Sequence, residues 1–311
     1  MSSSSANGPS YRWAVLAAAA TGVQVGAATV ASRFVVAEVA PLTLAMLRYA
    51  IALACLLPFV WSALSWQRLR QVLAEPAAMR PWLAMGALGI GQFGILIALL
   101  NFGLQHVTAA RAALIFSLFP LLTLLLSSAL GKERVTARLL AGVLLSICGV
   151  GIALAPRLRD IGAAHWYGEL AVLGAAAVGA LCSVLYRPYL QRYPTVQVSV
   201  FAMAASVLFL GLAALSEAWP TRLSLISAAG WGAVLFVGLS SAVGYIWWLF
   251  ALKHLAATRV TVFLALNPVT AAVLGQVLLG EPMDRWTVMA IALIALGLWL
   301  ATAMGSRGRP R

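Results

Sequence analysis

The chain has 311 residues, of which 63% are hydrophobic and 9% are charged, and its formal net charge is +13. Soluble domains carry roughly 25% charged residues, and a water-soluble fold cannot bury this much apolar surface. The composition therefore excludes a cytosolic enzyme, a disordered chain and a small secreted module, and it predicts an all-α integral membrane protein. The basic residues stand singly or in pairs between apolar runs, which is typical of membrane topology signals and not of nucleic-acid binding.

Ten apolar runs are each about long enough to cross a bilayer as a helix, which takes about 20 residues. Their predicted bounds, in chain order, are 13–36, 41–64, 82–102, 109–130, 137–155, 170–190, 196–215, 230–252, 260–279 and 286–304. The first run is longer than the apolar part of a cleaved signal peptide, so we interpret it as a retained helix. Cys55, Cys148 and Cys182 lie inside these runs without metal-ligand spacing, so neither a disulfide nor a metal site is predicted.

The positions of Lys and Arg predict the orientation of the chain. Fourteen of them fall on the side that holds the N-terminus, six fall on the other side, and Arg48 lies within a span. Because basic residues concentrate in cytoplasmic segments, both termini are expected to be cytoplasmic, with residues 1–12 as the N-terminal tail and 305–311 as a basic C-terminal tail. The same bias predicts attraction to anionic lipids on the cytoplasmic side.

The sequence contains an internal repeat at an offset of 148 residues, at which residues 102–111 align with 250–259 without a gap. Residue types other than the abundant Leu and Ala coincide: His106 with His254, Arg111 with Arg259, Pro120 with Pro268, Glu133 with Glu281 and Gly149 with Gly297. The repeat predicts two halves of five spans, 13–155 and 170–304, joined by a linker at 156–169. Since five is odd, the second half is inverted, an architecture that is typical of transporters with a substrate site near mid-bilayer.

Ten spans in two inverted halves, each with a His…Arg segment, a Pro in the next span and a Glu before the last, resemble the drug/metabolite transporter superfamily. Residues 104–133 and 252–281 resemble the paired repeats of its EamA-type exporters. Pro41 and Arg48 also fit that pattern, whereas Phe201 stands where a second Arg would correspond. The resemblance implies export of amino acids (aromatic ones included), nucleosides or drug-like cations from bacteria, across the inner membrane. It also implies a cavity lined mainly by the first, third, fourth, sixth, eighth and ninth spans.

Polar side chains at mid-membrane are costly and tend to face a cavity. The candidate substrate-binding residues are polar or aromatic side chains within the spans: Thr21, Gln24, Arg48, Gln92, Ser117, Tyr186, Ser241, Tyr245, Trp248 and Asn267. Pro120 and Pro268 lack a backbone donor and are predicted to kink their helices. Each kink either leaves polar groups for a substrate or is a plain bend.

For several candidates two interpretations stay open. Gln24 either lines a cavity or hydrogen-bonds a neighbouring helix, and Tyr186 either faces substrate or ends a stripe of small residues that packs helices. Trp248 either stacks on a substrate or anchors at the interface. Arg48 either binds a carboxylate or extends to the outer interface. Asn101 points about 180° away from Gln92 on an ideal helix, so the deeper Gln92 is the predicted lining residue.

No Asp or Glu lies in the middle of a predicted span, although ion-driven transporters commonly use buried carboxylates. The chain also lacks a GxxxxGK[ST] phosphate loop. We therefore expect a carrier that works by alternating access, moves a small-molecule substrate down its gradient, and needs no cofactor, metal or obligate protein partner. The favoured substrate is a zwitterion with an aromatic or other apolar side chain. The alternatives are nucleosides or drug-like compounds exported by proton antiport, a channel-like pore, and a membrane-embedded enzyme, for which no catalytic motif is present at membrane depth.

Overall fold

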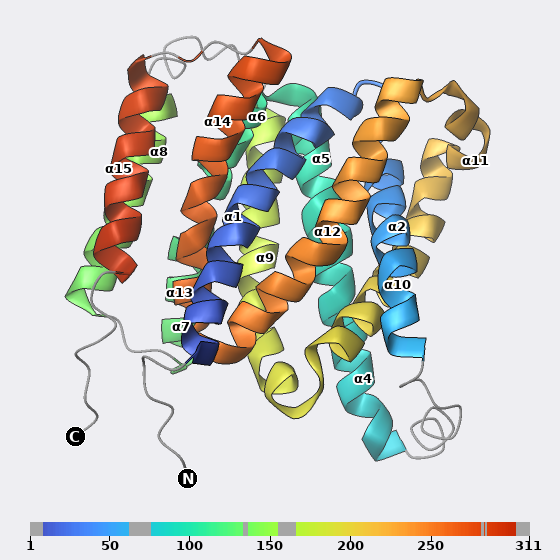
Figure 1. Cartoon of the computed structure of the whole chain (residues 1–311), viewed down its shortest axis with the longest axis horizontal. Coiled ribbons are helices and arrows are strands. Elements are labelled where there is room, and N and C mark those ends of the chain that lie inside the picture. Colours follow the sequence, from blue (N-terminus) through green and yellow to red (C-terminus); the bar gives the residue numbers. More distant parts are fainter. Residues whose placement is uncertain are drawn as a thin grey trace.

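The computed structural model describes residues 9–61, 76–132, 136–154, 166–280, 283 and 285–302, and within these ranges the chain is helical apart from short turns. Most of the helices run between two ends of one bundle (Figure 1). We name these ends after the first helix: α1 begins at the lower end and stops at the upper end. This membrane-protein fold agrees with the all-α prediction.

The helical elements follow the predicted spans closely. In chain order they are α1 (Pro9–Val35), α2 (Pro41–Trp61), α4 (Pro76–Gly89), the π-helical η1 (Ile90–Ile95), α5 (Leu96–His106), α6 (Ala109–Phe116), α7 (Phe119–Ala129), α8 (Ala137–Leu154), α9 (Trp166–Arg192), α10 (Thr195–Ala213), η3 (Ala214–Glu217), α11 (Trp219–Arg222), η4 (Leu223–Leu225), α12 (Ala228–His254), α13 (Ala257–Val262), η5 (Phe263–Ala265), α14 (Leu266–Leu279) and α15 (Arg285–Thr302).

Eight helical stretches among the described residues are long and apolar enough to cross a membrane. The two other predicted spans correspond to α8 and α15, which are helical over 18 residues each. Their apolar stretches within the described ranges are shorter, Leu140–Gly149 and Arg285–Gly297. A membrane protein with many helices is therefore confirmed, whereas the count of ten spans stays a prediction.

Three helices extend past the bounds that the apolar runs predict. The N-terminal tail was expected to reach residue 12, but α1 begins at Pro9, and proline is well suited to a first helical turn. The linker expected at 156–169 ends earlier, since α9 begins at Trp166. The third span, expected at 82–102, is helical from Pro76 to His106 and includes the π-helical segment η1.

Helix breaks coincide with the prolines of the repeat. Pro120 has no N–H for the carbonyl of Phe116, so α6 ends there and the amide of Ser117 bonds to the carbonyls of Ala113 (3.0 Å) and Leu114 (3.1 Å). The 3₁₀ turn η5 lies just before Pro268. A third proline, Pro188, lies inside α9 and leaves the carbonyl of Val184 without its helical donor, and Lys132 Nζ donates to this carbonyl at 3.2 Å.

The two halves pack as counterparts of each other. The α1 helix packs against α12 and α14, and its counterpart α9 packs in the same way against α5 and α7. The α8 helix pairs with α15 at one edge of the bundle, and α2 pairs with α10 (Figure 1). Since α1 rises from the lower end while α9 descends from the upper end, corresponding helices run in opposite directions, as an inverted repeat requires.

At the upper end, the carboxylates within the described ranges each join one half to the other. The three pairs are Glu38 with Ser227, Glu217 with Thr43 and Glu169 with Arg111. Both oxygens of Glu38 accept hydrogen bonds, at 2.9 and 3.0 Å, and those of Glu217 accept from the first turn of α2, at 2.7 to 3.0 Å. Any opening of the upper end by separation of the halves has to break these contacts.

Candidate substrate site

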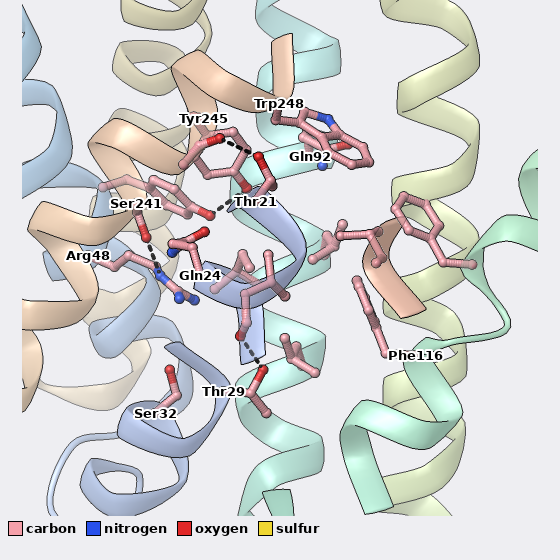
Figure 2. Close-up of a pocket in the computed structure, with 18 residues that line it drawn as sticks. Thr21, Gln24, Thr29, Ser32, Arg48, Gln92, Phe116, Ser241, Tyr245 and Trp248 are labelled. Atoms are coloured by element: carbon pink, nitrogen blue, oxygen red, sulfur yellow. Dashed lines mark hydrogen bonds between the residues drawn. The ribbon is translucent and has the colours of Figure 1, made fainter. Parts of the chain in front are cut away.

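A cavity lies within the bundle, between helices of both halves, and its empty volume together with the open space at its mouth is about 620 Å³ (Figure 2). Its wall is built from α1, α2, η1, α5, α6, α7, α12 and η5. The polar lining residues are Thr21, Gln24, Thr29, Ser32, Arg48, Gln92 and Ser241, and the aromatic ones are Tyr49, Phe116, Phe119, Tyr245 and Trp248. A cavity of this kind, mostly apolar with a few convergent polar groups, is typical of a small-molecule site.

Arg48 carries the charge of this cavity. Its side chain is 5% exposed, and its Nε donates to the Ser241 hydroxyl at 2.9 Å. Each carboxylate in the part of the chain that the structure describes is engaged at the upper end, so none of them pairs with Arg48. Moving an unpaired charge out of water costs roughly several kcal/mol per ion. The cavity is therefore strongly suited to an anionic group.

Aromatic rings form a second wall. The hydroxyls of Tyr49 and Tyr245 lie 2.8 Å apart, and the ring of Phe93 contacts both tyrosines edge-on, with centroid distances of 5.1 and 4.2 Å. Phe119 stacks with Trp248 at 6.0 Å. Ring pairs in such arrangements contribute about 0.5–1.5 kcal/mol each beyond simple burial. The rings thus hold the apolar part of the cavity in a fixed shape.

The α1 helix supplies the third wall and is bonded to α12 across the halves. Gln24 Nε2 donates to the Ser240 hydroxyl at 3.2 Å, and the Thr21 hydroxyl donates to the carbonyl of Ala17 at 2.8 Å. Gly244 has no side chain, and a Cβ atom there would collide with the Gln24 amide. Gln24 consequently lines the cavity and also bonds a neighbouring helix, so both interpretations of this residue describe its contacts.

Seven of the ten candidate residues line the cavity: Thr21, Gln24, Arg48, Gln92, Ser241, Tyr245 and Trp248. Gln92 lies in the π-helical turn η1 and is 4% exposed. Asn101, on the other face of that span, donates to the carbonyl of Pro41 at 3.1 Å. The side chain of Arg48 points into the protein, not toward the end of the helix.

Three candidates, Ser117, Tyr186 and Asn267, do not line the cavity, and neither do Pro120 and Pro268. The Ser117 hydroxyl donates to the carbonyl of Leu114 at 2.6 Å, the same carbonyl that the Ser117 amide reaches at 3.1 Å. Tyr186 is fully buried in helix packing. Asn267 is 1% exposed, and its backbone carbonyl lies against α1 at Gly26. That Ser117, Tyr186 and Asn267 bind substrate stays a prediction, and how each of their helices is turned sets their positions relative to the cavity.

Five polar or aromatic lining residues were not among the candidates: Thr29, Ser32, Tyr49, Phe116 and Phe119. Ser32 follows the small, polar face of α1 that already contained Thr21 and Gln24, so helical spacing was a usable signal for it. Phe116 and Phe119 stand on the two sides of the break before Pro120. Aromatic residues beside a proline kink were the signal for these two.

The comparisons with known proteins agree with this architecture. A sequence profile of the EamA-like transporter family matches residues 12–155 and 166–303, one match for each half. An uncharacterized transporter of Archaeoglobus fulgidus is 27% identical over 93% of this chain and 98% of its own length. A probable terminal-alkyne amino-acid exporter of Streptantibioticus cattleyicolor is 30% identical over 71% of this chain and 72% of its own length.

A solved crystal structure of a protein that is 24% identical superposes on this chain with a TM-score of 0.69 and covers 94% of it and 96% of the other chain. That likeness shows a shared fold. The profile match extends over both halves, and the chain therefore belongs to the EamA-like transporter family.

Proposed function

We propose that the chain exports small metabolites, and in particular amino acids with aromatic or other apolar side chains, by alternating access of the cavity to the two sides of the membrane. The observation that carries this proposal is Arg48, a nearly buried cation that faces a cavity and pairs with no described carboxylate. A substrate carboxylate supplies the missing charge through a charge-assisted pair of hydrogen bonds, which Arg forms better than any other side chain.

The opposite side of the cavity suits the rest of such a substrate. Arg48 lies on one side in Figure 2, and Trp248 and Phe116 lie on the other. A zwitterion with its carboxylate at Arg48 would direct an apolar side chain toward these rings. The probable terminal-alkyne amino-acid exporter of Streptantibioticus cattleyicolor, at 30% identity, supports an amino-acid substrate.

The proposed transport is facilitative. The described lining of the cavity contains no carboxylate that could relay protons, which supports a carrier driven by the substrate gradient. We place the protein in the bacterial plasma membrane with both termini in the cytoplasm, since Lys and Arg concentrate on that side. The upper end then faces outward, and the lower end contacts the anionic lipids of the cytoplasmic leaflet.

The test is counterflow into liposomes that contain the purified protein. Labelled L-phenylalanine, L-leucine and glycine are offered with and without a pH gradient, and protein-free liposomes give the background. We expect saturable uptake of the first two, unchanged by the gradient and lost in Arg48→Met. The matched control is Arg192→Met, which changes an exposed arginine at the end of α9. Uptake of no amino acid would overturn the proposal, and uptake that needs the gradient would overturn its facilitative part.

A further inference from the structure

We infer that Ser241 is a positioning residue that fixes the direction of the Arg48 guanidinium, so that the pair selects carboxylates over neutral carboxamides. This inference rests on the proposed function, because it concerns how the same cavity recognises its substrate. Ser241 is expected to act through Arg48 and not by binding substrate itself.

The hydrogen bonds of Ser241 leave its hydroxyl oxygen to act toward Arg48 only as an acceptor. Its hydroxyl proton is donated to the carbonyl of Val237 at 2.6 Å, one turn earlier in α12. A hydroxyl has only one proton, so its lone pairs are what it offers to Arg48 Nε at 2.9 Å. Both partners are nearly buried, at 2% and 5% exposure. Because the Val237 carbonyl belongs to a regular helix, the acceptor that Arg48 meets has a fixed position.

Fixing Nε fixes the whole head group, since the guanidinium is planar and rigid. With Nε engaged by Ser241, the donors left for a ligand are the N–H groups of the two Nη atoms, since the bond to Ser241 uses Nε alone. A carboxylate accepts two such bonds side by side. A carboxamide has one acceptor oxygen, and its NH₂ group would place a donor against a donor. The same geometry that accepts a carboxylate therefore disfavours the amide.

A close helix contact next to the pair sets the distance between its two helices. Gly238 on α12 lies against Ile51 on α2, and a Cβ atom at Gly238 would stand 2.6 Å from the Ile51 Cβ. Gly238 is three residues from Ser241, and Ile51 is three residues from Arg48. The absence of a side chain at Gly238 lets α12 approach α2 closely at the turn that carries the pair. The pair is thus assembled from both halves of the molecule.

The experiment compares Ser241→Ala with Ser199→Ala in the liposome assay. Ser199 is the matched control, because it is fully buried on α10 and donates to the carbonyl of Thr195 four residues earlier, at 2.9 Å, but bonds to none of the arginines that the structure describes. The measured quantities are the KM for labelled L-phenylalanine and the inhibition constant of unlabelled L-phenylalaninamide. We expect Ser241→Ala to raise the KM about tenfold, as for loss of a hydrogen bond to a charged group. The inhibition constant of the amide should change less than about twofold, and Ser199→Ala should change neither value.

Several outcomes would overturn the inference. The inference fails if Ser241→Ala keeps the wild-type ratio of the KM for L-phenylalanine to the inhibition constant of L-phenylalaninamide. That ratio is kept if both constants are unchanged, or if both rise equally as a general packing defect would make them. If Ser241→Ala does not fold, Ser241→Cys is used instead, since the thiol has a similar size but is a weak acceptor. The ratio of the KM to the inhibition constant then tests the inference in the same way. A wild-type protein that transports amino acids but does not prefer the carboxylate overturns the inference alone. A wild-type protein that transports no amino acid overturns the proposed function, and the inference with it.

Discussion

Replacing Arg48 by Met is expected to stabilise the empty protein while it abolishes transport. Arg48 is 5% exposed, makes one hydrogen bond to Ser241 and pairs with no described carboxylate. In Arg48→Met the Ser241 hydroxyl keeps its bond to Val237, so no donor is left without a partner. Methionine is unbranched and adapts to irregular space, so it can occupy much of the volume that Arg48 leaves.

The magnitude follows from the removal of a buried charge. Replacing buried ion pairs by apolar side chains of similar volume often stabilises proteins, by about 1–4 kcal/mol, and here the native state lacks even the compensating anion. Because the cavity is partly open and not fully enclosed, we expect the lower part of that range, about 1–2 kcal/mol. For chains somewhat smaller than this one, 1 kcal/mol corresponds to a shift in unfolding temperature of roughly 2–4 °C. The expected rise is thus a few degrees.

The assay is thermal unfolding in detergent, with and without the transported amino acid. A ligand at about 100 times its Kd stabilises the state that binds it by about 2.7 kcal/mol, so the amino acid should raise the unfolding temperature of the wild type but not that of Arg48→Met. Arg192→Met, which changes an exposed arginine, should behave as the wild type does. If Arg48→Met unfolds several degrees below the wild type, or if the amino acid stabilises it equally, Arg48 is a structural residue and the reasoning fails.

Three further outcomes are expected. Gly238→Ala should push α12 about 1 Å away from α2, since carbon atoms pack at about 3.5–4.0 Å, and the KM for the amino acid should rise; an unchanged KM would contradict this. Glu169→Gln removes the charge of the ion pair with Arg111 at the upper end. A membrane-impermeant thiol reagent added outside should therefore label Ser32→Cys in the cavity faster than it does with Glu169 present. Equal labelling rates would speak against closure of the upper end by this pair. Lys132→Met should lower the free energy of unfolding by about 1 kcal/mol, because its bond to the Val184 carbonyl is lost. In a Pro188→Ala background the backbone donor to that carbonyl is restored, so the loss should be much smaller. Equal losses in the two backgrounds, measured by thermal unfolding, would refute the coupling between Lys132 and Pro188.

The arrangement of the helices was predictable because its signals are local or periodic. Apolar run length predicts a membrane helix, and coincidences such as His106 with His254 at one offset predict the repeat. Helix ends were less predictable, since a helix can begin before its apolar run, as at Pro76 and Trp166. The confirmed part of the prediction is therefore the class of fold and not the residue at which each helix stops.

The candidate site was predictable where several polar residues share one helical face and less so elsewhere. Thr21 and Gln24 lie on one such face of α1, and both line the cavity. The direction of Arg48 depends on Ser241, which no local pattern connects to it. Ser117 and Asn267 stand next to helix breaks, where a small rotation decides whether a side chain faces the cavity or a neighbouring helix. The spacing of residues in the sequence does not specify how far a helix is rotated about its axis after a break.

The Arg48–Ser241 bond also bears on how the chain is made. The two residues are 193 positions apart, and synthesis at about 5–20 residues per second separates their appearance by roughly 10–40 s. Throughout that interval α2 carries an arginine whose partner helix does not yet exist, and an arginine at bilayer depth is costly. The nascent α2 is therefore expected to hold Arg48 near the membrane surface and to reach its full depth when α12 is inserted, so that the substrate site is completed late in biosynthesis.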